Sequence, residues 1–325
     1  MSTTAIRFHE HGGPQVLRPE SVELPPPAAG QVRVRHTAIG VNFIDTYHRT
    51  GLYAVELPSG LGMEAAGVVE TLGPGVEGLT VGQRVAYAAG PPGAYANHRN
   101  VRASVLVPLP EGIDDEVAAA SLLKGMTVEY LVRRTFAVQP GMTVLLHAAA
   151  GGVGLIACQW LAHLGATVIG TVGSDAKAEL AREHGCAHPI VYTREDFVER
   201  TLELTEGQGV PVVYDSVGRA TFDGSLRCLR RRGLMVGFGN ASGKPEPFEI
   251  GRLAKEGSLF LTRPTLFDYI ATREELLASA AALFEVMLAG AVKVPVRQRW
   301  PLAEAAQAHR ALEARATQGS SVLVP

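Results

Sequence analysis

The sequence predicts an α/β fold in which a doubly wound parallel sheet is combined with a β-rich domain. From residue 114 onward, short apolar runs alternate with helical segments, and one of these runs ends in a glycine-rich turn that opens a helix. Before residue 120, short strand-like runs are separated by frequent Gly and Pro turns. Strands alternating with crossover helices are typical of parallel sheets, whereas many short strands favour a compact, barrel-like β domain.

The β-rich part is predicted from alternation and from its breaks. Residues 31–37 alternate apolar and polar side chains, which is the period of a strand with one buried face. Gly73-Pro74-Gly75 and Gly90-Pro91-Pro92-Gly93 are turn sequences that end two further runs. The strands expected here are 5–8, 31–37, 65–73 and 82–87.

The middle of the chain is predicted to form six parallel strands with intervening helices. Acidic residues at 114–116 begin an alanine-rich helix, as the helix dipole favours. Strands are then expected at 143–146, 167–172, 189–192, 210–215, 233–238 and 258–262, with helices from 155, from 175 and over 195–204.

The last sixty residues are expected to rejoin the β-rich domain. Thr272 and Glu275 match a capping box before a long helix to Gly290. A strand at 292–299, a helix at 302–315 and a strand at 320–324 follow, after the parallel sheet is complete. The predicted division is therefore 1–122 together with 267–325 for the β-rich domain, and 123–266 for the domain with the parallel sheet.

Composition excludes several classes of function. A chain of 325 residues with 46% hydrophobic and 19% charged residues is typical of a soluble protein of about two domains. Its net charge of −2 gives no reason to expect nucleic acid or a membrane as partner. The first residues lack the apolar segment of a signal peptide, and the three cysteines are too scattered for a disulfide framework. We therefore expect a cytoplasmic protein.

The stretch from Thr143 to Gly154 predicts a dinucleotide site. In the pattern G-x-G-x-x-G, Ala149 occupies the first glycine position, and Gly151 and Gly154 the second and third. The second glycine lets the backbone approach a pyrophosphate, and the third lets helix and strand pack closely. The alternative, a purely structural glycine turn, is disfavoured by the strand–turn–helix context.

The tip of the second strand predicts NADPH rather than NADH. NAD sites usually carry an acid there, whereas this chain has Gly173 and Ser174, with Lys177 within a turn. A lysine favours the 2′-phosphate of NADPH. Two alternatives stay open: Asp175 either binds a ribose hydroxyl or is a first-turn acid of the next helix, and Lys177 is otherwise a solvated helix charge.

Several segments carry a resemblance to a known family. They are 39–47, 51–53, 57–67, 124–127, 147–154, 233–240 and 316–320. With these residues the chain resembles the medium-chain dehydrogenase/reductase superfamily and, within it, the zeta-crystallin-like NADPH:quinone oxidoreductase family. The resemblance implies a Rossmann doubly wound parallel sheet plus a GroES-like β-rich catalytic domain, with a cleft between them. It also implies a homodimer joined through the edge of the Rossmann sheet.

The same comparison argues against a metal site. Zinc enzymes of this superfamily carry a cysteine in the segment 38–41 and a Gly-His-Glu where this chain has Gly62-Met63-Glu64. Residues 85–110 contain no cysteine, although a structural zinc lobe needs four. The ten histidines show no metal-ligand spacing, so we expect no metal ligands in this chain.

The resemblance also implies residues that bind NADPH. The nicotinamide would lie near Asn42, Thr127, Phe238 and Gly239, and Ser216 and Val217 would pass close to the ribose. A strand-end tyrosine such as Tyr192 is otherwise a packing residue. The expected cofactor-binding residues are Asn42, Thr127, Ala150, Gly151, Gly152, Val153, Gly173, Ser174, Lys177, Tyr192, Ser216, Val217, Phe238 and Gly239.

Hydride transfer to a quinone places negative charge on an oxygen, so donors near that oxygen stabilise it. The candidates are the Asn42 amide and the phenols of Tyr47 and Tyr53, with Lys124 and Arg263 as more remote ones. Tyr53 is otherwise an exposed loop aromatic, and Asp45 is expected to orient its neighbours. The expected catalytic residues are Asn42, Asp45, Tyr47, Tyr53 and Thr127.

Three functions fit this pattern. The leading one is NADPH-dependent, zinc-independent reduction of a small quinone. The second is reduction of an activated C=C bond in an enone or enal, which needs the same hydride geometry. The third is a non-catalytic NADPH-binding protein, because a fold does not by itself fix a function.

Overall fold

The computed structural model describes all residues, 1–325, and the chain forms two compact units. Unit 1 comprises Met1–Lys124, Ile270–Leu288 and Val294–Pro325, so it is built from both ends of the chain. Unit 2 comprises Gly125–Tyr269 and Ala289–Lys293. No helix in either unit has the length and apolar character needed to span a bilayer.

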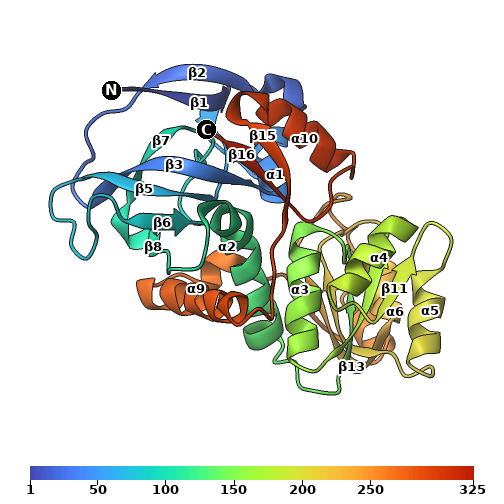
Figure 1. Cartoon of the computed structure of the whole chain (residues 1–325). Coiled ribbons are helices and arrows are strands. Elements are labelled where there is room, and N and C mark those ends of the chain that lie inside the picture. Colours follow the sequence, from blue (N-terminus) through green and yellow to red (C-terminus); the bar gives the residue numbers. More distant parts are fainter. The chain divides into compact units, whose positions relative to one another are not determined.

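Unit 1 is organised around a seven-stranded sheet. Its long central strand, β3 (Gln31–Val41), pairs antiparallel with β5 (Ala65–Leu72) on one side and with β16 (Ser320–Val324) on the other. The C-terminal strand therefore lies beside a strand from the start of the chain (Figure 1). The remaining strands are β6 (Arg84–Tyr87), β7 (His98–Arg102), β8 (Val107–Pro108) and β15 (Val296–Pro301).

A three-stranded sheet in the order β2-β1-β4 completes the β structure of unit 1. Its central strand β1 (Ser2–Phe8) buries Ile6 and Phe8 in one apolar core with β3 and β5. The sequence pattern missed β2 (Arg18–Glu23) and β4 (Ser59–Gly60), because the first is largely charged and the second has two residues.

Four helices belong wholly or partly to unit 1. They are α1 (Phe43–Thr50), the first part of α2 (Asp115–Glu129), α9 (Arg273–Leu288) and α10 (Ala305–Glu313). The helices at α2, α9 and α10 were predicted, whereas α1 was not. The strand expected at 292–299 is displaced to 296–301, because residues 292–295 make no ladder pairs.

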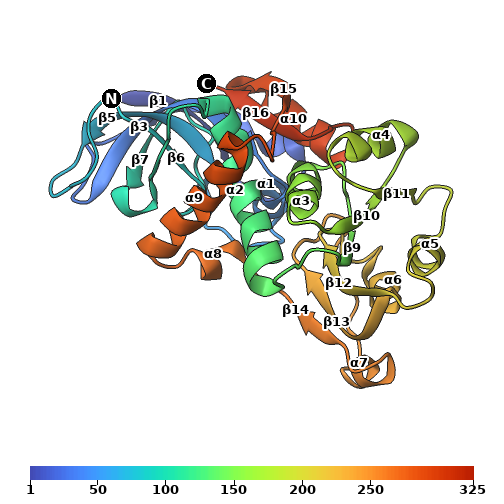
Figure 2. The ribbon, with the colours of Figure 1, turned by 60° about the horizontal axis from the view of Figure 1, so that its bottom comes forward.

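Unit 2 contains a six-stranded sheet in the order β11-β10-β9-β12-β13-β14, and every adjacent pair is parallel. This is the Rossmann strand order, and it confirms the predicted fold class. Figure 2 shows the strands following one another from β14 to β11. They are β9 (Thr143–Leu146), β10 (Thr167–Val172), β11 (His188–Val191), β12 (Val210–Asp215), β13 (Leu229–Gly237) and β14 (Phe260–Thr262).

The helices of unit 2 connect these strands. Strand β13 begins four residues before the predicted 233, because Leu229 pairs with Val210 and the charged residues 230–232 continue the strand. The helices are α3 (Gly152–His163), α4 (Asp175–Glu183), α5 (Phe197–Leu204), α6 (Phe222–Arg227), α7 (Gly251–Lys255) and α8 (Leu266–Tyr269).

Candidate functional site

The glycine-rich turn between β9 and α3 is packed against its own strand. A Cβ atom at Gly154 would lie 2.2 Å from the Ala148 carbonyl oxygen, so only glycine fits there. Ala148 has φ +56°, a left-handed conformation that costs free energy for a residue with a side chain. The Ala149 N–H donates to Thr171 O of β10 at 3.0 Å, which fixes the turn to the neighbouring strand.

The start of α3 offers main-chain donors to a ligand. Gly151 is the residue before the helix, and no side chain accepts a hydrogen bond from the first-turn N–H groups. The first turn also carries no acidic residue that would repel an anion. Such a helix start binds phosphate through its free N–H groups and its positive dipole end. The predicted residues Ala150, Gly151, Gly152 and Val153 all lie in this turn and first helical turn.

A second group of predicted residues meets at the carboxyl ends of β10 and β11. A Cβ atom at Gly173 would lie 2.8 Å from the Tyr192 hydroxyl oxygen, so strand tip and phenol are in contact. Ser174 caps α4, and its Oγ accepts from the Lys177 main-chain N–H at 3.4 Å. Tyr192 is 42% exposed, so it is not a buried packing residue. Gly173, Ser174, Lys177 and Tyr192 therefore form one corner.

Asp175 has a partner in this corner. Its carboxylate lies 2.6 Å from Arg194 Nη2, and this ion pair lowers the pKa of Asp175. Asp175 is the first residue of α4, so the alternative interpretation as a first-turn acid is confirmed. A carboxylate paired with a guanidinium repels a phosphate less than a lone one does. The local charge of Lys177, Arg194 and Asp175 together is positive.

A third group of predicted residues lies after β12 and β13. A Cβ atom at Gly239 would lie 2.4 Å from the Ser216 carbonyl oxygen, and the Phe238 N–H donates to Asp215 O at 2.8 Å. The Ser242 N–H donates to Val217 O at 2.8 Å. These loops border a hollow of about 430 Å³ whose wall includes Gly239, Asn240 and Arg263. Ser216, Val217, Phe238 and Gly239 are thus brought together.

These groups of unit 2 all lie at the carboxyl ends of the parallel strands. Strand β12 pairs with β9 beside the glycine turn, where the strand order reverses. In open parallel sheets, nucleotides bind at such a reversal, outside the carboxyl ends of the strands. Thr127, also predicted, is buried in the part of α2 that belongs to unit 2.

A buried polar network beneath the glycine turn was not predicted. His147 Nδ1 and Nε2 each lie 2.9 Å from a hydroxyl, those of Thr171 and Ser225. Ser225 in turn donates to Asp215 Oδ2 at 3.1 Å, while Asp215 Oδ1 accepts the Val217 and Gly218 N–H groups. The network ties β9, β10 and the loop after β12 together. Burial lowers the pKa of His147, so it is neutral here.

In unit 1, the predicted catalytic residues lie on or beside α1. Asp45 is fully buried, and its Oδ2 accepts from the Asn42 main-chain N–H at 2.8 Å and from the Tyr95 hydroxyl at 3.0 Å. Burial raises the pKa of Asp45 to about 7, against the lowering effect of these hydrogen bonds. Asp45 therefore holds the start of the helix that carries Asn42 and Tyr47.

The two phenols predicted to act in catalysis are neighbours. The Tyr47 and Tyr53 rings meet edge to face, with centroids 5.2 Å apart, and the Tyr53 N–H donates to Tyr47 O at 3.1 Å. Tyr53 also contacts the His48 ring. Tyr53 is half-buried against these two rings, so the alternative interpretation as an exposed loop aromatic does not hold.

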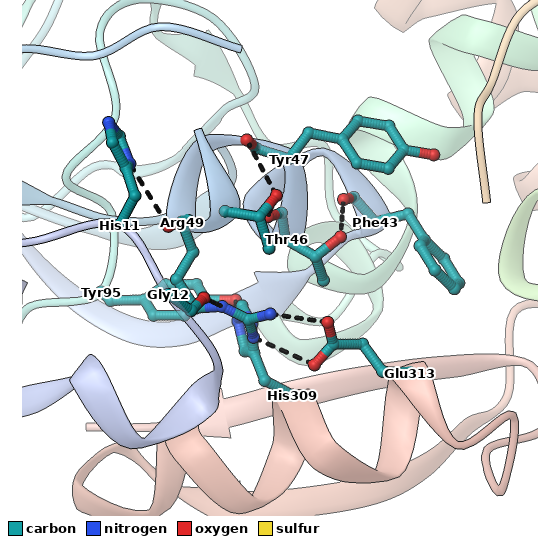
Figure 3. A network of polar contacts seen from close by, with 10 residues as sticks. His11, Gly12, Phe43, Thr46, Tyr47, Arg49, Tyr95, His309 and Glu313 are labelled. Atoms are coloured by element: carbon teal, nitrogen blue, oxygen red, sulfur yellow. Dashed lines mark hydrogen bonds and ion pairs between the residues drawn. The ribbon is translucent and has the colours of Figure 1, made fainter. Parts of the chain in front are cut away.

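The C-terminal end of α1 is fastened by Arg49. Its guanidinium donates to Gly12 O, to His309 Nδ1 and to both carboxylate oxygens of Glu313, as Figure 3 shows. His309 Nε2 lies 3.1 Å from the Tyr95 hydroxyl. None of these partners was predicted, because they come from segments up to 264 residues apart.

Glu64 joins Asn42 to Lys124, which the sequence had placed among the remote candidates. Glu64 is fully buried, its Oε1 accepts from the Leu123 N–H at 2.6 Å, and its Oε2 accepts from Asn42 Nδ2 at 2.9 Å. Lys124 Nζ lies 3.5 Å from the same Oε2. Burial raises the pKa of Glu64, while the Lys124 charge and these donors oppose that rise. One Asn42 donor is therefore used within the protein.

Comparison with family models matches both halves of the chain. Residues 28–111 match the alcohol dehydrogenase GroES-like domain, and residues 152–283 match the zinc-binding dehydrogenase family. The two matched ranges lie largely in unit 1 and unit 2 respectively.

Full-length relatives are closely similar. The chain is 54% identical over 327 residues to a quinone oxidoreductase of Salmonella typhimurium, covering 99% of both chains. It is 48% identical to a 2-haloacrylate reductase of a Burkholderia species, covering 99% of this chain and 98% of the relative. The crystal structure of Escherichia coli quinone oxidoreductase complexed with NADPH matches 99% of this chain and all of its own, with 52% identity and a TM-score of 0.98.

Proposed function

Because the chain belongs to the quinone oxidoreductase family of the medium-chain dehydrogenase/reductase superfamily, we propose that it is an NADPH-dependent reductase of small quinones. The observation that carries the proposal is the corner of Gly173, Ser174, Lys177 and Tyr192 beside the glycine turn. A phosphate-binding turn with a lysine at the adjacent strand tip suits a dinucleotide with a 2′-phosphate. The NADPH complex of the similar Escherichia coli enzyme supports the same cofactor.

Different groups of residues in unit 2 bind different parts of the cofactor. The main-chain N–H groups of 150–153 hold the pyrophosphate, and the corner around Lys177 holds the 2′-phosphate. The loops at 216–217 and 238–239, with Thr127, hold the nicotinamide ribose and ring. When bound, NADPH supplies the hydride. The protein supplies the orientation of that hydride and the exclusion of water.

The residues of unit 1 act on the acceptor. The Tyr47 and Tyr53 phenols and the second N–H of the Asn42 amide are donors for the oxygen on which charge develops. Asp45 is a positioning residue, because it binds the main-chain N–H of Asn42 and is shielded from solvent. Replacing Tyr47 by Phe removes one phenol while keeping its ring contact with Tyr53, and a fall in kcat is expected.

The residues do not fit the zinc that one family description implies. At the ligand positions this chain has the thioether of Met63 and a segment 38–41 without cysteine. The adjacent carboxylate of Glu64 is already beside a cation, the Lys124 ammonium. No three His, Cys, Asp or Glu side chains are grouped to hold a metal ion. We propose a zinc-independent reaction, and stoichiometric zinc in purified, active protein would contradict it.

A titration with NADPH and NADH, followed by a panel of acceptors, tests the proposal. Benzoquinones should be reduced with NADPH at the highest kcat/KM. Tight NADPH binding without turnover on any quinone or enone would instead favour a non-catalytic NADPH-binding protein.

One observation favours a second candidate function. The similarity to a 2-haloacrylate reductase, at 48% identity, supports reduction of an activated C=C bond. Hydride addition to such a bond also places charge on a carbonyl oxygen, so the same donors would serve. An enone or haloacrylate preferred over every quinone in the panel would replace the quinone assignment by this one.

We propose a homodimer formed through the edge of the unit 2 sheet. Strand β14 is the last strand of the sheet, so its outer edge has no partner strand in this chain. Phe260 on it is 60% exposed, and Leu261 beside it is also exposed. An apolar strand edge favours pairing with a second copy. Phe260→Asp should shift the protein to a monomer in sedimentation.

The three unpaired cysteines support a cytoplasmic location.

A further inference from the structure

Lys124 is a buried cation with few contacts to protein acceptors. The residue is only 5% exposed, and its Nζ makes one long contact to a protein acceptor, Glu64 Oε2, and no hydrogen bond of ordinary length and angle. The contact with Glu64 Oε2 is 3.5 Å long, which is long for a charge-assisted hydrogen bond. An ammonium carries three N–H donors, so at least two of them point to no protein acceptor.

Such an arrangement is costly unless it serves a purpose. Burying a charge with so few hydrogen bonds costs roughly several kcal/mol of solvation free energy. A single ion pair at this distance does not compensate for that loss. Each buried unsatisfied donor therefore calls for an explanation, and catalysis is one. A methionine or leucine would fill the same space at lower cost.

The surrounding residues are arranged to keep the ammonium in place. Both Glu64 oxygens are held by neutral donors, Leu123 N–H and Asn42 Nδ2, so the carboxylate cannot turn away from Lys124. A Cβ atom at Gly40 would lie 2.4 Å from Glu64 Oε2, so a glycine there makes room for the carboxylate. The Lys124 charge also reaches Asp45, whose pKa it lowers against burial.

We propose that Lys124 is a catalytic residue that binds the acceptor oxygen and gives it a proton, and that Glu64 positions its ammonium. The inference rests on the proposed reductase function. It makes Lys124 the main donor to the acceptor oxygen in place of Asn42. One N–H of the Asn42 amide already donates to Glu64, whereas most N–H groups of the Lys124 ammonium have no protein acceptor.

A quinone that has accepted a hydride, supplied by NADPH, is a hydroquinone monoanion with one phenolate oxygen. One N–H bond of Lys124 breaks and one O–H bond forms, which gives neutral hydroquinone and a neutral amine. The quinone is reduced by the hydride, and the lysine changes only its protonation. The amine then takes a proton from solvent.

Binding of 4-nitrophenol to the protein without cofactor tests the site directly. Its phenolate form is coloured and mimics the charged oxygen. Wild-type protein should lower the pKa of the bound phenol by about 1 to 3 units, as an opposite charge within 4 to 6 Å does. Lys124→Met should abolish this shift, whereas the same change at the exposed Lys255 of α7 should leave it intact.

Turnover gives the second readout. Loss of a proton donor lowers kcat by about 10²-fold or more, so Lys124→Met should lose that factor in kcat with a smaller change in KM. Lys124→Arg keeps the charge and should retain the phenolate shift. If Lys124→Met fails to fold, the double variant Glu64→Gln with Lys124→Met removes both buried charges and replaces it.

The two possible failures are distinguishable. A wild-type enzyme that reduces quinones but leaves the phenol pKa unchanged, or shifts it equally in Lys124→Met, overturns the role of Lys124 alone. A Lys124-dependent phenolate shift in a protein that reduces no quinone sinks the reductase proposal and leaves the anion site standing.

Discussion

Arg49 and Glu313, 264 residues apart in the chain, form a two-point ion pair that joins α1 to α10. Arg49 Nη2 lies 2.6 Å from Glu313 Oε1, and Nη1 lies 3.1 Å from Oε2 (Figure 3). The Arg49 side chain is almost completely buried, while that of Glu313 is one-third exposed. The pair therefore fixes the helix that carries Asp45 and Tyr47 against the C-terminal segment.

Glu313→Gln should destabilise unit 1 measurably. Removing one partner of a fully buried pair costs about 3–5 kcal/mol, and we expect about 2 kcal/mol here because Glu313 reaches solvent. The midpoint of urea unfolding should fall accordingly. The matched control is Glu116→Gln, which breaks an exposed pair with Arg299 at 2.7 Å and should cost less than about 1 kcal/mol. Equal effects of the two variants would contradict a structural role for the Arg49 pair.

Arg49 also sets the direction of a buried hydrogen-bond chain. A guanidinium only donates, so His309 Nδ1 must accept from it and Nε2 must carry the proton towards Tyr95. The Tyr95 hydroxyl then donates to Asp45 Oδ2 at 3.0 Å. Burial and the Arg49 charge lower the pKa of His309 to about 3, which keeps the imidazole neutral.

Asp45 and the buried histidines His36 and His309 should affect the pH dependence of stability in opposite directions. The Asp45 pKa is raised from 3.8 to about 7, so the folded state holds a proton that the unfolded state has lost between these values. Its contribution to stability is present at low pH and is lost as pH rises. The pKa of His36 is lowered to about 4 and that of His309 to about 3, so their contributions are lost as pH falls below 6.5.

Asp45→Asn removes the titrating carboxyl group and with it the proton that the folded state retains at Asp45. The stability of this variant relative to wild type should increase between pH 4 and pH 7, by on the order of 4 kcal/mol. Urea unfolding of both proteins at a series of pH values measures the difference. His36→Gln is the control with the opposite sign. Parallel stability curves for wild type and Asp45→Asn would show that Asp45 titrates normally.

The parallel sheet of unit 2 could be predicted because its signals are local. Apolar strands, the turn at 149–154 and the helix starts each lie within a few consecutive residues. Helix α1 could not, since Phe43–Thr50 contains β-branched and aromatic residues that favour strands. It forms because the Asp45 carboxylate accepts the main-chain N–H of Asn42, the residue before the helix, and because Arg49 near its end binds Glu313, which is distant in the sequence.

The candidate site follows the same rule. Gly173, Ser174 and Lys177 are neighbours in sequence and were predicted as one corner, whereas Arg194 was missed because only strand pairing brings it to Asp175. Met63 at a ligand position was visible in the sequence. That Glu64 would hold a lysine was not, because 60 residues separate Glu64 from Lys124 and the sheet and helix α2 must form before they meet.

Gly154→Ala should damage both the fold of unit 2 and its affinity for a dinucleotide. The added methyl group would lie 2.2 Å from Ala148 O and 2.6 Å from the Ala149 carbonyl carbon, so the helix must move off its strand. Overpacking of this kind costs about 1–3 kcal/mol. Thermal unfolding and NADPH titration measure the two effects. Gly251→Ala, at the start of α7 with open space around it, is the control and should change neither.

Lys177→Ala should separate NADPH from NADH. Lys177 lies in the first turn of α4, beside the contact between Gly173 and Tyr192, where a 2′-phosphate would be surrounded. A charge-assisted hydrogen bond contributes about 1.5–3 kcal/mol, so the Kd for NADPH should rise about 10- to 100-fold while that for NADH changes little. Titration with 2′,5′-ADP and 5′-AMP isolates the phosphate from the rest of the cofactor, and only the former should weaken. Lys255→Ala on α7 provides the control for a lost surface charge. Equal losses for both nucleotides would assign Lys177 to the helix surface and leave the 2′-phosphate to Arg194 and Tyr192.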